Sequence, residues 1–100
     1  MIPLYQVIIQ PEAEAELDEA YAYFESQQPG LGFELLANLS ETISLLEDNP
    51  LIFQKVYGEK RRAIVKRFGY NVIYKVVDKN VFILAIMHGN RDPWHWKIRG

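Results

Sequence analysis

The second half of the chain gathers arginine, lysine and histidine side chains, which can bind anions, together with two tryptophans. Arginine donates two parallel hydrogen bonds to a phosphate or carboxylate, and aromatic rings offer stacking surfaces for bases. A strand of nucleic acid and an acidic protein surface both suit this mixture, and composition does not separate them. The residues concerned are Arg61, Arg62, Lys66, Arg67, Lys75, His88, Arg91, Trp94, His95, Trp96, Lys97 and Arg99.

The charged residues are divided between the two halves of the chain. Residues 1–54 contain ten acids and no Lys or Arg, whereas residues 55–100 contain all eleven Lys and Arg and three acids. The formal charges are therefore −10 and +8, and the net charge of −2 conceals a strong dipole. If the halves fold into different layers, one face attracts anionic partners and the other repels them. The alternative is that the halves pair with each other.

Most other site chemistry is missing from the sequence. There is no cysteine, no nucleophile with a partner base, no paired-carboxylate site and no phosphate-binding loop. His88 and His95 are the only histidines, and with Asp92 they make a poor set of metal ligands. We therefore expect no metal and no cofactor. His88 can act as a general acid or base, or it can simply complete the end of a strand.

The size and composition indicate one domain over residues 1–100. With 49% hydrophobic and 13% aromatic residues, the chain can bury a real core. The N-terminus lacks the basic and apolar regions of a signal peptide, and no segment approaches the roughly 20 apolar residues of a membrane span. We expect a soluble, cytoplasmic protein with no membrane partner.

Hydrophobic periodicity predicts a strand, two helices and three further strands. The first strand covers residues 4–9, and a helix runs from Pro11 to about Gln28. After Pro29-Gly30 a second helix ends at Asn49-Pro50, with one apolar face formed by Phe33, Leu36, Leu39, Ile43 and Leu46. Residues 51–60 are predicted to be a loop, and the last strands cover residues 61–67, 70–77 and 81–88.

This order predicts a two-layer α+β domain, β-α-α-β-β-β, with a helical hairpin packed on a mainly antiparallel sheet. The last two strands are apolar on both faces at their centres, which predicts cover on both sides. Arg61 and Arg62 are neighbours in a strand, so they point to opposite faces. One of Trp94 and Trp96 is expected to pack on the sheet, as are Tyr70 and Tyr74.

The chain resembles the RelE/ParE superfamily of small toxins from bacterial type II toxin–antitoxin modules. The resemblance extends over nearly its whole length, and the order and spacing of the matching segments make it specific. These segments are Pro11-Glu12-Ala13, Pro29-Gly30, Arg61-Arg62, the run from Phe68 to Tyr74, the run from Ala85 to Pro93, and Trp96 with Arg99.

The resemblance implies a growth-inhibiting protein, of the kind associated with plasmid stabilisation, that a cognate antitoxin neutralises. We expect the antitoxin to contribute an acidic, partly disordered segment that folds onto the sheet edge or the helix groove. The superfamily contains two activities. RelE-like members cleave mRNA on the ribosome, whereas ParE-like members poison DNA gyrase and lack the catalytic set.

Three observations favour the ParE-like alternative. The tail has no Tyr, the lysine-rich sheet edge of basic ribonucleases is thin, and the isoelectric point of about 5.6 is low for a protein that docks on ribosomal RNA. For gyrase, the expected target-binding residues are Arg61, Trp94, His95, Trp96, Lys97 and Arg99. For the ribonuclease alternative, Arg62, Arg67 and Arg91 would stabilise the phosphate and His88 would transfer a proton. A non-toxic protein-interaction module is a third alternative.

Overall fold

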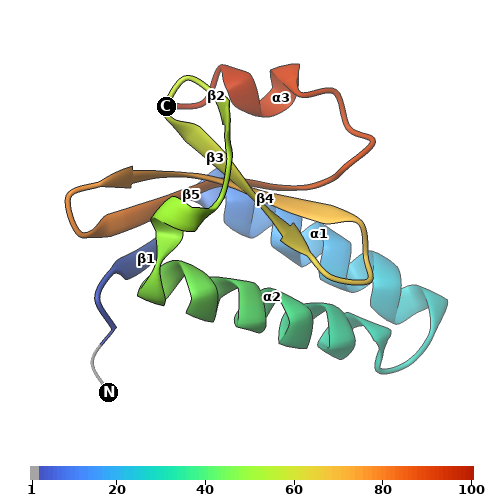
Figure 1. Ribbon diagram of the computed structural model, residues 1–100. Coiled ribbons are helices and arrows are strands. Elements are labelled where there is room, and N and C mark those ends of the chain that lie inside the picture. Colours follow the sequence, from blue (N-terminus) through green and yellow to red (C-terminus); the bar gives the residue numbers. More distant parts are fainter. Residues whose placement is uncertain (1–2) are drawn as a thin grey trace.

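The computed structural model describes residues 3–100 and places a helical pair on one side of a five-stranded sheet (Figure 1). A short third helix lies on the other side of the sheet, beside its β2 edge (Figure 1). The elements are β1 (Gln6–Ile9), α1 (Pro11–Gln27), α2 (Leu31–Asp48), the 3-10 turn η1 (Pro50–Ile52), β2 (Lys55–Tyr57), β3 (Lys60–Val65), β4 (Tyr70–Val77), β5 (Asn80–His88) and α3 (Trp94–Lys97). The α+β class and the helical hairpin predicted from the sequence are confirmed.

The sheet has the strand order β1-β5-β4-β3-β2. Strand β1 runs parallel to β5, and every other neighbouring pair is antiparallel. The prediction of a loop over residues 51–60 was wrong, because this segment contains η1 and the edge strand β2. Strand β2 has only three residues and an irregular register with β3, so it is too short for an alternating pattern to reveal.

Helix α1 begins at Pro11, whose fixed φ angle suits the first helical position and whose missing N–H is not needed there. The helix ends shortly before Gly30, which adopts φ 90°, a left-handed conformation that favours glycine. The Glu25 carboxylate accepts hydrogen bonds from the backbone N–H groups of Gly30 and Gly32, the latter at 2.8 Å. One side chain thus closes the turn and satisfies free donors at the start of α2.

The buried face of α2 is rotated from the predicted one. The prediction placed Phe33 and Leu36 in the core, but Phe33 is 64% exposed and Leu36 is half-buried. The fully buried positions are Gly32, Leu35, Leu39, Thr42 and Leu46. The rotation follows from the close contact of Gly32 with α1, where an added Cβ would lie 2.8 Å from ring atoms of Tyr21. The Phe33 ring instead meets Tyr21 edge-on at 5.5 Å, on the outside of the hairpin.

The main core lies between the helical pair and the sheet. Its largest fully buried side chain is Tyr74, whose hydroxyl donates to the carbonyl of Pro50 at 2.5 Å. Burial raises the pKa of Tyr74 to about 12. Core residues include Leu35, Leu46, Val65, Val72, Val81, Ile83 and Ile86. A smaller cluster on the opposite face consists of Ile73, Ala85, Met87 and Trp96, so the predicted cover on both sides of the central strands is confirmed.

Candidate functional site

The open face of the sheet, which points away from α1 and α2, carries α3 as a partial cover. Trp96 of α3 is 9% exposed and packs with Ile73, Ala85 and Met87, whereas Trp94 is 61% exposed. This confirms the prediction that one of the two tryptophans packs on the sheet. Burial of the Trp96 indole fixes α3 against the sheet, and the remaining side chains of α3 are presented to solvent.

A groove between α3 and the β2 edge gathers cations. We call it the β2–α3 groove; it has a volume of about 360 Å³ and is lined by Gln54, Lys55, Val56, Arg62, Pro93, Trp96 and Lys97. Arg62 lies on β3 with its side chain on the open face, whereas Arg61 points to the helical side, as strand alternation predicts. Within residues 3–100, the exposed Arg62 side chain makes no hydrogen bond or ion pair.

Two ammonium groups lie against the ring of Tyr57 at the rim of this groove. The Nζ atoms of Lys60 and Lys97 are 5.7 and 5.1 Å from the ring centroid, and Lys60 also donates to the main-chain carbonyl of Lys97 at 3.2 Å. Cation–π contacts hold positive charge at a defined place without neutralising it. Glu59 forms an ion pair with Lys55 of the groove, with 2.9 Å between Oε2 and Nζ. The hydrogen bond from Lys55 lowers the pKa of Glu59.

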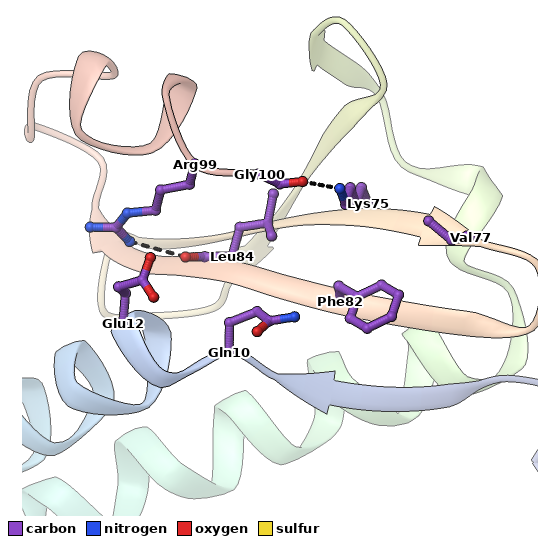
Figure 2. A pocket seen from close by; sticks show the side chains of 8 residues that line it. All are labelled: Gln10, Glu12, Lys75, Val77, Phe82, Leu84, Arg99 and Gly100. Carbon is purple, nitrogen blue, oxygen red and sulfur yellow. Dashed lines mark hydrogen bonds between the residues drawn. The ribbon is translucent and has the colours of Figure 1, made fainter.

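The residues after α3 are attached to the sheet by Arg99. Its guanidinium binds both oxygens of Glu16, at 2.9 and 3.2 Å, and donates to the carbonyl of Leu84 at 3.0 Å. Figure 2 shows this arm reaching across a second cavity toward β5, with Lys75 bonded to the carbonyl of Gly100. That cavity has a volume of about 320 Å³ and an apolar floor formed by Val77, Phe82 and Leu84.

The attachment depends on an irregularity in β5. The register shifts between Ile73 and Tyr74, and Leu84 is the extra residue opposite that step. Strand β1 reaches only as far as Ile83, so the edge of β5 is uncovered from Leu84 onward. The Glu16–Arg99 pair occupies that edge, because Arg99 binds the carbonyl of Leu84 and Glu16 accepts the N–H of Ile86 at 3.1 Å.

His88 and Arg91 lie in a different place, the β5–α1 pocket. It has a volume of about 190 Å³ and is lined by Glu16, Glu19, Ala20, Tyr23, Tyr70, Ile86, Met87, His88 and Arg91. His88 Nδ1 accepts a hydrogen bond from the backbone N–H of Asn90 at 3.1 Å, and the His88 ring stands edge-on to Tyr70. Burial, assisted by nearby Tyr23, raises the pKa of Tyr70, while Arg91 acts in the opposite direction. The charge of Glu16 is balanced by Arg99, but Glu19 makes no ion pair within residues 3–100, and its carboxylate opposes the binding of a phosphate in this pocket.

The four residues expected for a ribonuclease are not brought together. Arg62 lies in the β2–α3 groove, and His88 and Arg91 lie in the β5–α1 pocket. Arg67 adopts φ 75° after β3 and binds Glu34 of α2 at 2.9 Å, with both side chains about half exposed.

Of the residues expected to bind a target, four lie on α3 and two are engaged elsewhere. Trp96 and Lys97 line the β2–α3 groove, and Trp94 and His95 are exposed beside it. Arg61 donates to the carbonyls of Leu51 and Phe53, and Arg99 is held by Glu16, so these two arginines act within the fold.

Several residues of these sites were missed in the sequence analysis. Lys55, Tyr57 and Lys60 belonged to the predicted loop, yet all three contribute to or border the β2–α3 groove. The period-two pattern of Lys60, Arg62 and Ile64 was the available signal for this face. No local pattern points to Glu16, because its partner Arg99 is 83 residues away.

Residues 3–100 contain neither a metal-binding cluster nor a membrane-spanning helix. No three His, Asp or Glu side chains gather in a way that would hold a metal ion. None of the described helices has the length and apolar composition that crossing a membrane requires.

The α+β fold is similar to that of a solved structure described as the chromosomal ParDE toxin–antitoxin system from P. aeruginosa. The TM-score is 0.74 and the identity 17%, with coverage of 85% of this chain and 96% of the other. No curated protein matches the chain. Residues 7–93 match the family model described as the ParE toxin of the type II toxin–antitoxin system parDE, and the chain belongs to this family. Membership implies an antitoxin partner.

Proposed function

We propose that this toxin inhibits bacterial growth by binding DNA gyrase, and that the β2–α3 groove with α3 is the surface that engages the target. The observation that supports this is the gathering of exposed cations and rings on the side of the sheet away from the acidic helices. Arg62 and Trp94 are exposed there, and neither Arg62 nor Lys97 pairs with an acid within residues 3–100. Exposed aromatic and arginine side chains are typical of interface hot spots.

The antitoxin is proposed to be the second partner. Its expected acidic segment suits the cationic side of the sheet, where positive potential would speed association. The acidic helices would repel the same segment. The proposed setting for both partners is the cytoplasm.

A ribosome-dependent ribonuclease is the weaker candidate. What favours it is that His88, Arg91 and Tyr70 share one pocket, which combines an imidazole, a guanidinium and a phenol that can each donate to a phosphate. What opposes it is that Glu16 and Glu19 line that pocket while Arg62 and Arg67 lie elsewhere. A phosphate in this pocket would therefore meet Arg91 beside the carboxylate of Glu19, where a ribonuclease needs several cations.

Two assays run side by side test the proposal. We expect the purified chain to inhibit a gyrase supercoiling reaction, and an excess of the cognate antitoxin to restore the reaction. In parallel, mRNA 5′ ends are mapped on translating ribosomes with wild type and with the double variant His88→Ala, Arg91→Ala. Full gyrase activity at excess toxin would refute the gyrase target, and cleavage lost in the double variant would establish the ribonuclease instead. Harmless overexpression in a bacterial host would point to an interaction module and contradict both.

A further inference from the structure

The β2–α3 groove contains a guanidinium that the fold itself does not use. Arg61, Arg67 and Arg99 each bond to a carbonyl or a carboxylate, but Arg62 has no such partner within residues 3–100. Arg91 also has none, but it lies in the β5–α1 pocket with Glu19. Lys97 lines the same groove, and its ammonium group is held against the Tyr57 ring. An unpaired arginine beside a fixed ammonium forms a site for an anion with several oxygens.

The walls of the groove restrict what the anion is attached to. Val56, Pro93 and Trp96 line the groove with apolar surface, and Trp94 on the same short helix is 61% exposed. A row of carboxylates from an acidic peptide would satisfy the cations but would leave this apolar surface without a matching group. Unpaired bases match it, because every base has a face that stacks on an aromatic ring. In a duplex those faces are already covered by neighbouring base pairs.

We propose that the β2–α3 groove binds a single strand of DNA, with Arg62 and Lys97 on the phosphates and Trp94 stacked on a base. The inference rests on the proposed function and deepens it: at gyrase, the toxin would contact the DNA that the enzyme holds as well as the protein. The net charge of −2 is no obstacle, because the acids of the first half lie on the helical side of the sheet.

Fluorescence anisotropy with a labelled single-stranded oligonucleotide of mixed sequence tests the site. If the groove-lining Lys55 adds to Arg62 and Lys97, about three phosphates are neutralised, and affinity should fall about 20-fold between about 50 and about 200 mM salt. The double variant Arg62→Gln, Lys97→Gln should reduce that change to about threefold. Lys79→Gln is the matched control, since Lys79 is also a lysine beside an aromatic ring, 4.9 Å from the Tyr5 centroid, but lies away from the groove. Equal loss in the control and the double variant would overturn the assignment.

The stacking part has its own variant. Trp94→Ala should weaken binding about fivefold or more, and circular dichroism should show an unchanged fold because the ring is exposed. Unchanged affinity of this variant would assign binding to charge alone and overturn the preference for a single strand. A duplex of the same sequence should bind more weakly than the single strand, and equal affinity for the two would also overturn that preference.

Two competing ligands complete the test. An RNA strand of the same sequence should bind no more tightly than the DNA strand, and a tenfold preference for RNA would overturn the assignment to DNA. A peptide of alternating Asp and Leu should bind more weakly than either strand, and a tighter complex would mark the groove as a protein site. If wild type inhibits gyrase but binds no single strand, the DNA-binding inference fails and the proposed function stands. If wild type binds the single strand but does not inhibit gyrase, the groove binds DNA and the proposed gyrase target is wrong.

Discussion

The pair between Arg99 and Glu16 should contribute more to stability than any other ion pair of the described chain. The two side chains retain only 18% and 17% of their exposure, and the pair is bidentate. Replacing Arg99 by Met leaves the Glu16 carboxylate largely buried with one remaining donor, the N–H of Ile86. Breaking a fully buried pair costs about 3–5 kcal/mol, and the residual contact with water lowers our expectation to about 2–3 kcal/mol. For a domain of this size, that corresponds to a fall in Tm of roughly 10–20 °C.

Urea unfolding of Arg99→Met measures this cost, and Arg67→Met provides the control. Arg67 binds Glu34 at the same distance of 2.9 Å, but the two side chains are 57% and 47% exposed. An exposed pair contributes at most about 1 kcal/mol, so the control should change stability little. The double variant Glu16→Gln, Arg99→Met should recover part of the loss, because the neutral amide introduced by the first substitution can still accept the N–H of Ile86 without a buried charge. Equal losses in the two arginine variants would refute the reasoning, since burial would then have no effect.

Three further predictions concern the core and the helix contact. The pKa of Tyr74 is raised to about 12 in the folded state, so the protonated phenol contributes fully to the free energy of unfolding below about pH 10, and this contribution is lost between about pH 10 and 12. Over that range the free energy of unfolding, measured from alkaline unfolding curves, should fall by about 2–3 kcal/mol, and Tyr74→Phe should abolish this fall. Trp96→Ala should cost about 3–5 kcal/mol in urea unfolding, whereas Trp94→Ala should stay within about 0.5 kcal/mol, and similar values would contradict the placement of α3. Gly32→Ala should cost about 1–3 kcal/mol because the new Cβ would lie 2.9 Å from the carbonyl oxygen of Tyr21; thermal unfolding at the wild-type Tm would show that α1 and α2 can separate without cost.

The element types could be predicted because their signals are local. Pro11 begins a helix, Pro29-Gly30 ends it, and alternation along β3 places Arg61 and Arg62 on opposite faces. The rotation of the buried face of α2 has no such local signal. It depends on Gly32 meeting Tyr21, a contact between two helices that spacing along one helix does not reveal.

The candidate site was predicted in composition but not in geometry. Arginines were expected to act as a group, yet Arg61, Arg67 and Arg99 bind carbonyls or carboxylates of the fold. In the described chain only Arg62 and Arg91 have no such partner, and they line different pockets. An arginine is bound within the fold only where folding brings a carbonyl or carboxylate acceptor within hydrogen-bond distance. For Arg99 that acceptor exists because the irregular step in β5 exposes the carbonyl of Leu84.

The sequence left open whether the acidic and basic halves pair with each other or give the protein one anionic and one cationic face. The structure shows both, with the second outcome dominant. Two acids of the first half, Glu16 and Glu34, pair with arginines across the layers; the other eight make no ion pair in the part of the chain that the structure describes. Most of the dipole therefore persists in the folded protein, with the cations of the β2–α3 groove facing away from the helices. An anionic partner thus meets attraction on one face and repulsion on the other, and this asymmetry orients it before any contact forms.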